Sequence, residues 1–193
     1  MIERRWQLCF VFLFFMQGSL SAIAETGLIS LQDALNTRGT VIMFRHALAP
    51  GFGDPPNFSV DDCSTQRNLD ARGREQSKSI GMQFKTLGYT AEVVYSSPWC
   101  RCLETARLMD IGPVRSFGGL GSFFEGHVDR SQTLKQLNTQ LKSIALVQSK
   151  PVVMVTHQVV ISAITRMGTS SGEAILYDPA SARSQRIRLS DND

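Results

Sequence analysis

The sequence lacks an apolar stretch long enough to cross a lipid bilayer. Its strongest apolar run, residues 8–16, has about nine residues, whereas a spanning helix needs roughly 20. Two arginines precede this run, and Ala22-Ile23-Ala24 follows it as a cleavage site of the A-x-A type. The pattern predicts a secretory signal peptide over residues 1–24, a mature domain over residues 25–193, and a periplasmic or secreted protein.

The mature sequence also lacks an excess of either charge. Without residues 1–24 it has 18 Lys and Arg against 16 Asp and Glu. It contains neither a basic block nor an alternation of aromatic with basic residues, so nothing indicates nucleic acid or an anionic membrane as a partner. With 42% hydrophobic and 19% charged residues in 193, the composition suits one globular domain.

Several common catalytic signatures are missing. A cysteine phosphatase needs an arginine six residues after its nucleophile, but the three mature cysteines are followed at that distance by Leu69, Ala106 and Leu108. No P-loop and no G-x-S-x-G turn occurs. The spacing Cys100-x-Cys102 matches no common structural zinc site. The sequence therefore favours none of these four classes of protein.

The mature cysteines are Cys63, Cys100 and Cys102. Export to an oxidising compartment would allow a disulfide. On a helix, residues 100 and 102 lie about 200° apart around the axis, so only one can face the loop that holds Cys63. We predict at most one disulfide, from Cys63 to one of the other two beside Arg101, and one free thiol.

Strands alternate with helices along the chain. A loop over residues 48–68, rich in Gly, Pro, Asp and Asn, interrupts the pattern, and loops of this length are usually functional or mobile. The alternation predicts an α/β sandwich with a largely parallel central sheet. The expected strands are 41–44, 92–97, a short one near 114, 151–156, 174–177 and 187–189, and the expected helices are 31–37, 71–87, 99–109, 130–148 and 160–166.

Polar side chains follow three of these strands. Arg45-His46 ends the first, a turn over residues 97–101 follows the second, and His157 follows a later one. The carboxyl ends of parallel strands lie along one edge of a sheet, where α/β folds bind ligands. Arginine offers a fork of donors for phosphate oxygens, and a neutral imidazole can attack phosphorus. The sequence thus predicts a phosphoryl site at this edge.

Four motifs in this order resemble the histidine phosphatase superfamily, also called the phosphoglycerate mutase-like family. Phe44-Arg45-His46-Ala47 is similar to its R-H-G motif, with alanine in place of the glycine. LDARGREQ at 69–76 resembles L-T-x-x-G-x-x-Q, and SSPWCRCLETA at 96–106 resembles S-S-P-x-x-R-x-x-Q-T-A. Val155-Thr156-His157 matches the second histidine.

The resemblance implies a three-layer αβα sandwich and a phosphoric monoester hydrolase that needs no metal or cofactor. His46 would be the phosphorylated nucleophile, and Arg45, Arg101 and His157 would bind the phosphoryl group. The substrate would be a phosphorylated small molecule. Export points towards a cell-envelope sugar phosphate, as in the lipopolysaccharide core heptose phosphate phosphatases that the chain also resembles.

The proton donor is where the sequence departs most from the family. Gln158 follows the second histidine, so the His-Asp pair of the acid phosphatase branch is missing. Glu125 is the only carboxylate of the loop 120–127, although it lies later than the family pattern expects, and we predict it as the donor. Asp54, Asp61 or Asp62 of the long loop could take this role, or the protein could lack a donor, as the small phosphohistidine phosphatases do. The remaining alternative is a non-catalytic phosphate-binding domain.

Overall fold

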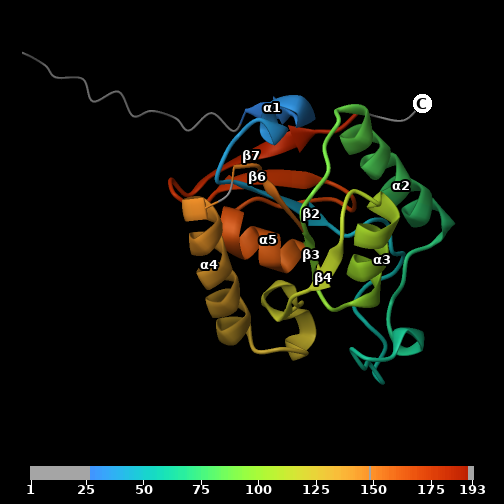
Figure 1. Cartoon of the computed structure of the whole chain (residues 1–193). Coiled ribbons are helices and arrows are strands. Elements are labelled where there is room, and N and C mark those ends of the chain that lie inside the picture. The colour runs from blue at the N-terminus through green and yellow to red at the C-terminus, as the bar shows by residue number, and fades with distance from the viewer. Residues whose placement is uncertain (1–26, 148, 191–193) are drawn as a thin grey trace, which may run out of the picture.

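The computed structural model of the chain describes residues 27–147 and 149–190 (Figure 1). The expected signal peptide, residues 1–24, lies outside these ranges and stays a prediction. No helix within the described part of the chain is long and apolar enough to cross a membrane.

A seven-stranded sheet in the order β1-β7-β6-β2-β5-β3-β4 forms the centre of the fold. All neighbouring strands pair in parallel except β6, which is antiparallel to both β2 and β7. The predicted α/β fold with a mostly parallel sheet is therefore confirmed. The strands are β1 (Leu28–Ser30), β2 (Val41–Arg45), β3 (Val94–Ser96), β4 (Val114–Ser116), β5 (Val152–Thr156), β6 (Ala174–Asp178) and β7 (Arg183–Arg188).

The two central strands, β2 and β5, are apolar along nearly their whole length because both of their faces are covered. Alternate residues of β2 enter different cores. Ile42 and Phe44 pack into one hydrophobic cluster, and Val41 and Met43 pack into the other. This double burial explains why an unbroken apolar run identified these strands in the sequence.

Helices cover both faces of the sheet. In Figure 1, α2 and α3 lie on one side of the strands, and α4 and α5 lie on the other. The chain is thus a three-layer αβα sandwich. Side chains at the N-caps begin two of the helices, since Ser30 Oγ accepts a hydrogen bond from Asp33 N and Asp70 Oδ1 accepts one from Gly73 N. The helices are α1 (Leu31–Leu35), α2 (Ala71–Thr86), α3 (Cys100–Met109), α4 (Arg130–Val147) and α5 (Gln158–Thr165), with short 3₁₀ turns η1 (Cys63–Thr65), η2 (Gly118–Leu120) and η3 (Phe124–Gly126).

Two features of the sheet edge were not predicted. Strand β1 has only three residues, too few to show a period, and it pairs with β7. Strand β7 begins at Arg183, four residues before the expected start. These four residues show no strand pattern in the sequence because they are polar, and Ile187 is the only buried residue of the strand. Both strands lie at the β1 end of the sheet, where few residues are buried and the hydrophobic pattern is weak.

The fold brings the three predicted polar segments together. β2, β5 and β3 are adjacent and parallel, with Phe44 opposite Val155 and Val155 opposite Ser96. The residues that follow these strands therefore share one edge of the sheet. The segment between β2 and α2 passes over this edge and completes the candidate site.

Candidate active site

His46 has the protonation state and orientation of a nucleophile. It is buried, and its main-chain N–H donates to Thr156 O at 3.0 Å. Nδ1 lies 2.8 Å from Ala47 O, and because a carbonyl can only accept, the ring proton sits on Nδ1 and the Nε2 lone pair is left for a substrate. Burial, followed by the charge of Arg101, lowers the pKa of His46 to about 3. The imidazole is therefore neutral near pH 7.

His157 lies beside His46 at the N-terminus of α5, with the two ring centroids 5.5 Å apart. Its Nε2 is 2.9 Å from Ser97 Oγ. Ser97 Oγ accepts from Trp99 N at 3.4 Å, so the hydroxyl hydrogen can be donated to His157 and the ring proton placed on Nδ1. Burial and the neighbouring Arg101 hold the pKa of His157 well below its usual value. With this tautomer His157 is a neutral hydrogen-bond donor beside His46.

Three arginines line a cavity of about 320 Å³ together with both histidines: Arg45 from β2, Arg67 from the long loop and Arg101 from the first turn of α3. Thr105 fixes Arg101 relative to β2, because its Oγ1 donates to Arg101 O at 2.7 Å and accepts from Ala47 N at 3.0 Å. The structure therefore brings Arg45, His46, Arg101 and His157 into one cavity.

Two of these arginines have unused donors. Arg45 Nη1 donates to Thr169 O at 2.8 Å and to Gln158 Oε1 at 3.2 Å. The Nε atoms of Arg45 and Arg101, however, are buried and find no acceptor among the described residues. Buried guanidinium N–H groups are normally satisfied, and an oxyanion in the cavity is the acceptor that suits them.

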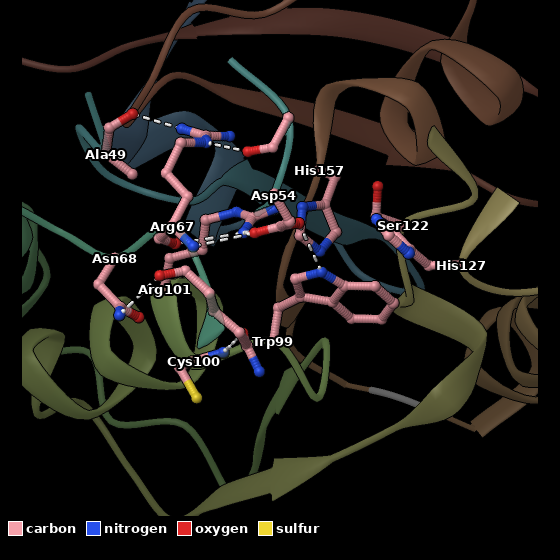
Figure 2. Close-up of polar contacts among 12 residues, drawn as sticks. Ala49, Asp54, Arg67, Asn68, Trp99, Cys100, Arg101, Ser122, His127 and His157 are labelled. Atoms are coloured by element: carbon pink, nitrogen blue, oxygen red, sulfur yellow. Dashed lines mark hydrogen bonds and ion pairs between the residues drawn. The ribbon is translucent and has the colours of Figure 1, made fainter. Parts of the chain in front are cut away.

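Asp54 is bound directly to Arg101 (Figure 2). Its Oδ1 accepts from Arg101 Nη1 at 2.6 Å and from Arg67 N at 3.0 Å. Its Oδ2 accepts from Arg101 Nη2 and from Trp99 Nε1, both at 3.1 Å. Burial alone would raise the pKa of Asp54, but these hydrogen bonds outweigh it and lower the pKa. The carboxylate is therefore ionised, and it holds both terminal nitrogens of Arg101, whereas the buried Nε has no acceptor within the described structure.

Sequence reasoning missed Arg67. Its Nε donates to Gly53 O at 2.8 Å and its Nη1 donates to Ala49 O, so the side chain fixes the turn that carries Asp54. One signal was available, since Arg67 is the only Lys or Arg between residues 46 and 71. An isolated cation in a long loop is a candidate for a specific contact.

A disulfide joins Cys63 to Cys100 and ties the long loop to the first turn of α3. Cys102 is a free, buried thiol with Sγ 3.5 Å from His157 Nε2. Burial raises the pKa of Cys102 to about 12. The prediction of one disulfide beside Arg101 and one free thiol is confirmed, and Cys100 is the partner because it faces the loop while Cys102 faces the sheet.

Removing this disulfide should destabilise the protein. The bond closes a loop over a sequence separation of 37 residues, and the chain-entropy model gives roughly 3–4 kcal/mol for a loop of that size. We expect Cys63→Ser/Cys100→Ser to lower the free energy of unfolding in urea by that amount. Reductant should destabilise the wild type and leave the double variant unchanged. Equal sensitivity of both proteins to reductant would contradict the prediction, as would three free thiols in the denatured, unreduced mature chain.

Glu125 lies outside the residues that line the cavity. Its Oε2 accepts from Asp54 N at 3.2 Å and lies 3.6 Å from His127 Nε2. A Cβ on Gly53 would come within 2.4 Å of Glu125 Oε1, so a larger residue there would displace the Glu125 carboxylate. Glu125 therefore supports the turn that carries Asp54, and its role as proton donor stays a prediction.

The other residues considered for this role have different positions. Of the three aspartates of the long loop, only Asp54 lines the cavity. Asp61 is exposed, and Asp62 caps η1 by accepting from Ser64 N at 2.9 Å. His127 packs its ring against Phe58, with centroids 4.2 Å apart.

The buried histidines predict a characteristic pH dependence of stability. An unfolded imidazole takes up a proton near pH 6.5, whereas folded His46 does so only near pH 3, so the free energy of unfolding should fall as the pH drops through this window. Lowering the pH from 7 to 5, in phosphate-free buffer, should reduce the free energy of unfolding of the wild type by roughly 2 kcal/mol more than that of His46→Gln. Parallel urea-unfolding profiles for the two proteins would contradict a neutral, buried His46.

Comparisons with known proteins relate the chain to phosphatases through structure alone. No family model matches the chain, and no curated protein matches it in sequence. Alpha-ribazole phosphatase from Shigella flexneri is similar with a TM-score of 0.56 at 14% identity, over 79% of this chain and 100% of that one. The mycobacterial glucosyl-3-phosphoglycerate phosphatase gives 0.53 at 14% identity, over 76% and 96%.

A third similar structure is a chain designated phosphohistidine phosphatase SixA from Agrobacterium tumefaciens. It gives a TM-score of 0.51 at 16% identity, over 79% of this chain and 97% of that one. The chain therefore shares its fold with these three phosphatases, and the phosphoglycerate mutase-like fold that its motifs predicted is confirmed.

Proposed function

We propose that the chain is a phosphatase that hydrolyses a phosphomonoester through a phosphohistidine on His46. Arg45, Arg101 and His157 bind the phosphoryl group in this proposal, and Arg67 adds positive charge to the same cavity. The four motifs of the sequence and the fold shared with solved phosphatases support this assignment.

The observation that carries the proposal is the pairing of a neutral nucleophile with unsatisfied donors. His46 directs its proton towards Ala47 O and keeps Nε2 free, while the buried Nε groups of Arg45 and Arg101 have no acceptor within the described structure. A phosphoryl group would satisfy both arginines and place phosphorus before His46. A site built only for packing would explain neither feature.

The reaction follows from these positions in two steps. His46 Nε2 attacks phosphorus while the arginines and the His157 Nδ1–H stabilise the charge on the equatorial oxygens. The leaving oxygen departs with the P–O electron pair and takes up a proton that the attacking water releases through solvent, while the His46 proton stays on Nδ1 and is donated to Ala47 O throughout. Water then attacks the phosphohistidine and releases phosphate and free His46.

The assay that tests the proposal is release of phosphate from para-nitrophenyl phosphate by the mature protein, with EDTA present because we propose metal independence. Orthovanadate, which mimics the transferred phosphoryl group, should inhibit competitively. Vanadate binding without turnover would identify the alternative, a non-catalytic phosphate-binding domain. Absence of both would contradict a phosphoryl site.

The location and the natural substrate are part of the proposal. The pattern of residues 1–24 supports export to the periplasm or beyond, and mass spectrometry of the intact protein should find Glu25 at the amino terminus. Export would bring the enzyme to phosphorylated small molecules of the cell envelope, and sugar phosphates are the substrates expected if Glu125 acts as the proton donor. A phosphohistidine phosphatase that lacks a carboxylate donor is the second candidate, because Glu125 lies outside the cavity lining.

A further inference from the structure

The mouth of the active-site cavity carries an exposed pair of aromatic rings. Phe52 and Phe124 line the same cavity as His46, and they are 87% and 37% exposed. Their ring centroids lie 5.2 Å apart in an edge-to-face arrangement. Gly51 and Gly53 flank Phe52 with φ of 95° and 68°, a conformation that favours glycine and shapes the turn that presents the ring.

This pair contributes little to the stability of the fold. A buried phenylalanine stabilises a fold by roughly 1.5–3 kcal/mol through the hydrophobic effect. Phe52 contributes almost none of this free energy because its side chain is exposed. The rings are instead free to cover an apolar group that enters the cavity. Aromatic rings pack on one another at centroid distances of about 4.5–7 Å, so a ring on the substrate could stack on this pair.

A second, independent feature concerns the leaving oxygen. Among the described residues, Asp54 is the only carboxylate that lines the cavity, and four donors hold it in the ionised state. It therefore offers no proton to a departing alcohol. An alkoxide depends on such a proton, which contributes roughly 10²- to 10⁴-fold. A phenol ionises near pH 10, as tyrosine does, so a phenolate depends on it much less.

From these two features we propose that the site is selective for aryl phosphomonoesters, with the aryl ring packed on Phe52 and Phe124. This inference rests on the proposed phosphatase activity. The bond from His46 Nε2 to phosphorus forms as the P–O bond to the ring breaks, and the phenolate leaves with the electron pair. Water then attacks phosphorus, and the N–P electron pair returns to Nε2. The proton of the water goes to the phenolate through solvent.

Three substrates separate the effect of the ring contact from the effect of the leaving group. Phenyl and benzyl phosphate both carry a ring but differ in leaving group, whereas benzyl and n-butyl phosphate both release an alcohol and differ in the ring. We expect kcat/KM for phenyl phosphate to exceed that for benzyl phosphate by at least about 10²-fold, the size of the missing acid catalysis. A sugar phosphate or benzyl phosphate turned over as fast as phenyl phosphate would overturn the inference.

The ring contact is tested by binding, independently of turnover. Phenylphosphonate should bind roughly tenfold more tightly than methylphosphonate, and Phe52→Ala should remove most of this preference. Met82→Ala, which removes an exposed apolar side chain from α2, is the matched control and should keep it. Vanadate inhibition should be the same in all three proteins. If Phe52→Ala keeps the wild-type ratio of phenylphosphonate to methylphosphonate affinity, the ring contact is wrong. If the wild type does not bind vanadate at all, the proposed function is wrong instead.

Glu125→Gln decides whether a donor exists after all. If the site works without one, the variant should change kcat/KM for phenyl and n-butyl phosphate by the same factor. A loss confined to n-butyl phosphate would identify Glu125 as the proton donor and overturn the selectivity for aryl leaving groups.

Discussion

Replacing His46 by alanine should abolish the phosphoenzyme and reduce kcat/KM for para-nitrophenyl phosphate by roughly 10⁴-fold or more, the scale seen when a nucleophile is removed. His157 cannot take over, because its Nε2 is already engaged by Ser97 Oγ. A phosphoryl group on imidazole nitrogen is stable in base and labile in acid, so a rapid quench in alkali should trap it in the wild type only.

The other two histidines provide the controls for this experiment. His157→Ala should retain some labelling, because we assign His157 to charge stabilisation and not to attack. His127→Ala changes a histidine that packs on Phe58 outside the cavity lining and should label like the wild type. Equal labelling of wild type and His46→Ala would show that the nucleophile is wrongly assigned.

Arg101→Met should lower both activity and stability, for different reasons. It removes a donor to the phosphoryl oxygens, which should lower kcat/KM by roughly 10²- to 10³-fold. It also leaves the Asp54 carboxylate buried with only the neutral donors Arg67 N and Trp99 Nε1. Breaking one partner of a buried ion pair costs roughly 3–5 kcal/mol, which urea unfolding should show.

The double variant Arg101→Met/Asp54→Leu separates these two effects. Removing both charges of a buried pair together is often nearly neutral, so most of the lost stability should return. Activity and vanadate affinity should remain low, because Arg101 is still missing. Recovery of activity in the double variant would show that Arg101 acts only by pairing with Asp54. Additive losses of stability would contradict a buried, coupled pair.

The parts of the site that lie on regular elements were predictable because each has a local signal. β2 and β5 are apolar in all but their last residue, and each is followed directly by a polar residue of the site, His46 or His157. The parallel arrangement of strands then requires their carboxyl ends to meet. The position of Arg101 follows in the same way from the turn after β3.

The loop residues of the site were not predictable, because their contacts join segments far apart in the sequence. Asp54 pairs with Arg101 across 47 residues, and its main-chain N–H binds Glu125 across 71. No periodicity marks such contacts, since they depend on where the loop is tied. For this reason the sequence left several aspartates open, and only the folded loop shows which of them lines the cavity.

The sequence by itself determined the fold class, the nucleophile candidate and the upper limit of one disulfide, because hydrophobic period, motif order and helical geometry are properties of short segments. Tertiary structure alone decided that Cys100 pairs with Cys63, that Arg67 joins the cavity, and that the exposed ring of Phe52 lies at the mouth of the cavity. The physical reason is that these side chains meet their partners only after the backbone has brought distant segments within a few ångströms. The sequence of a single segment does not show which distant segment will come close to it.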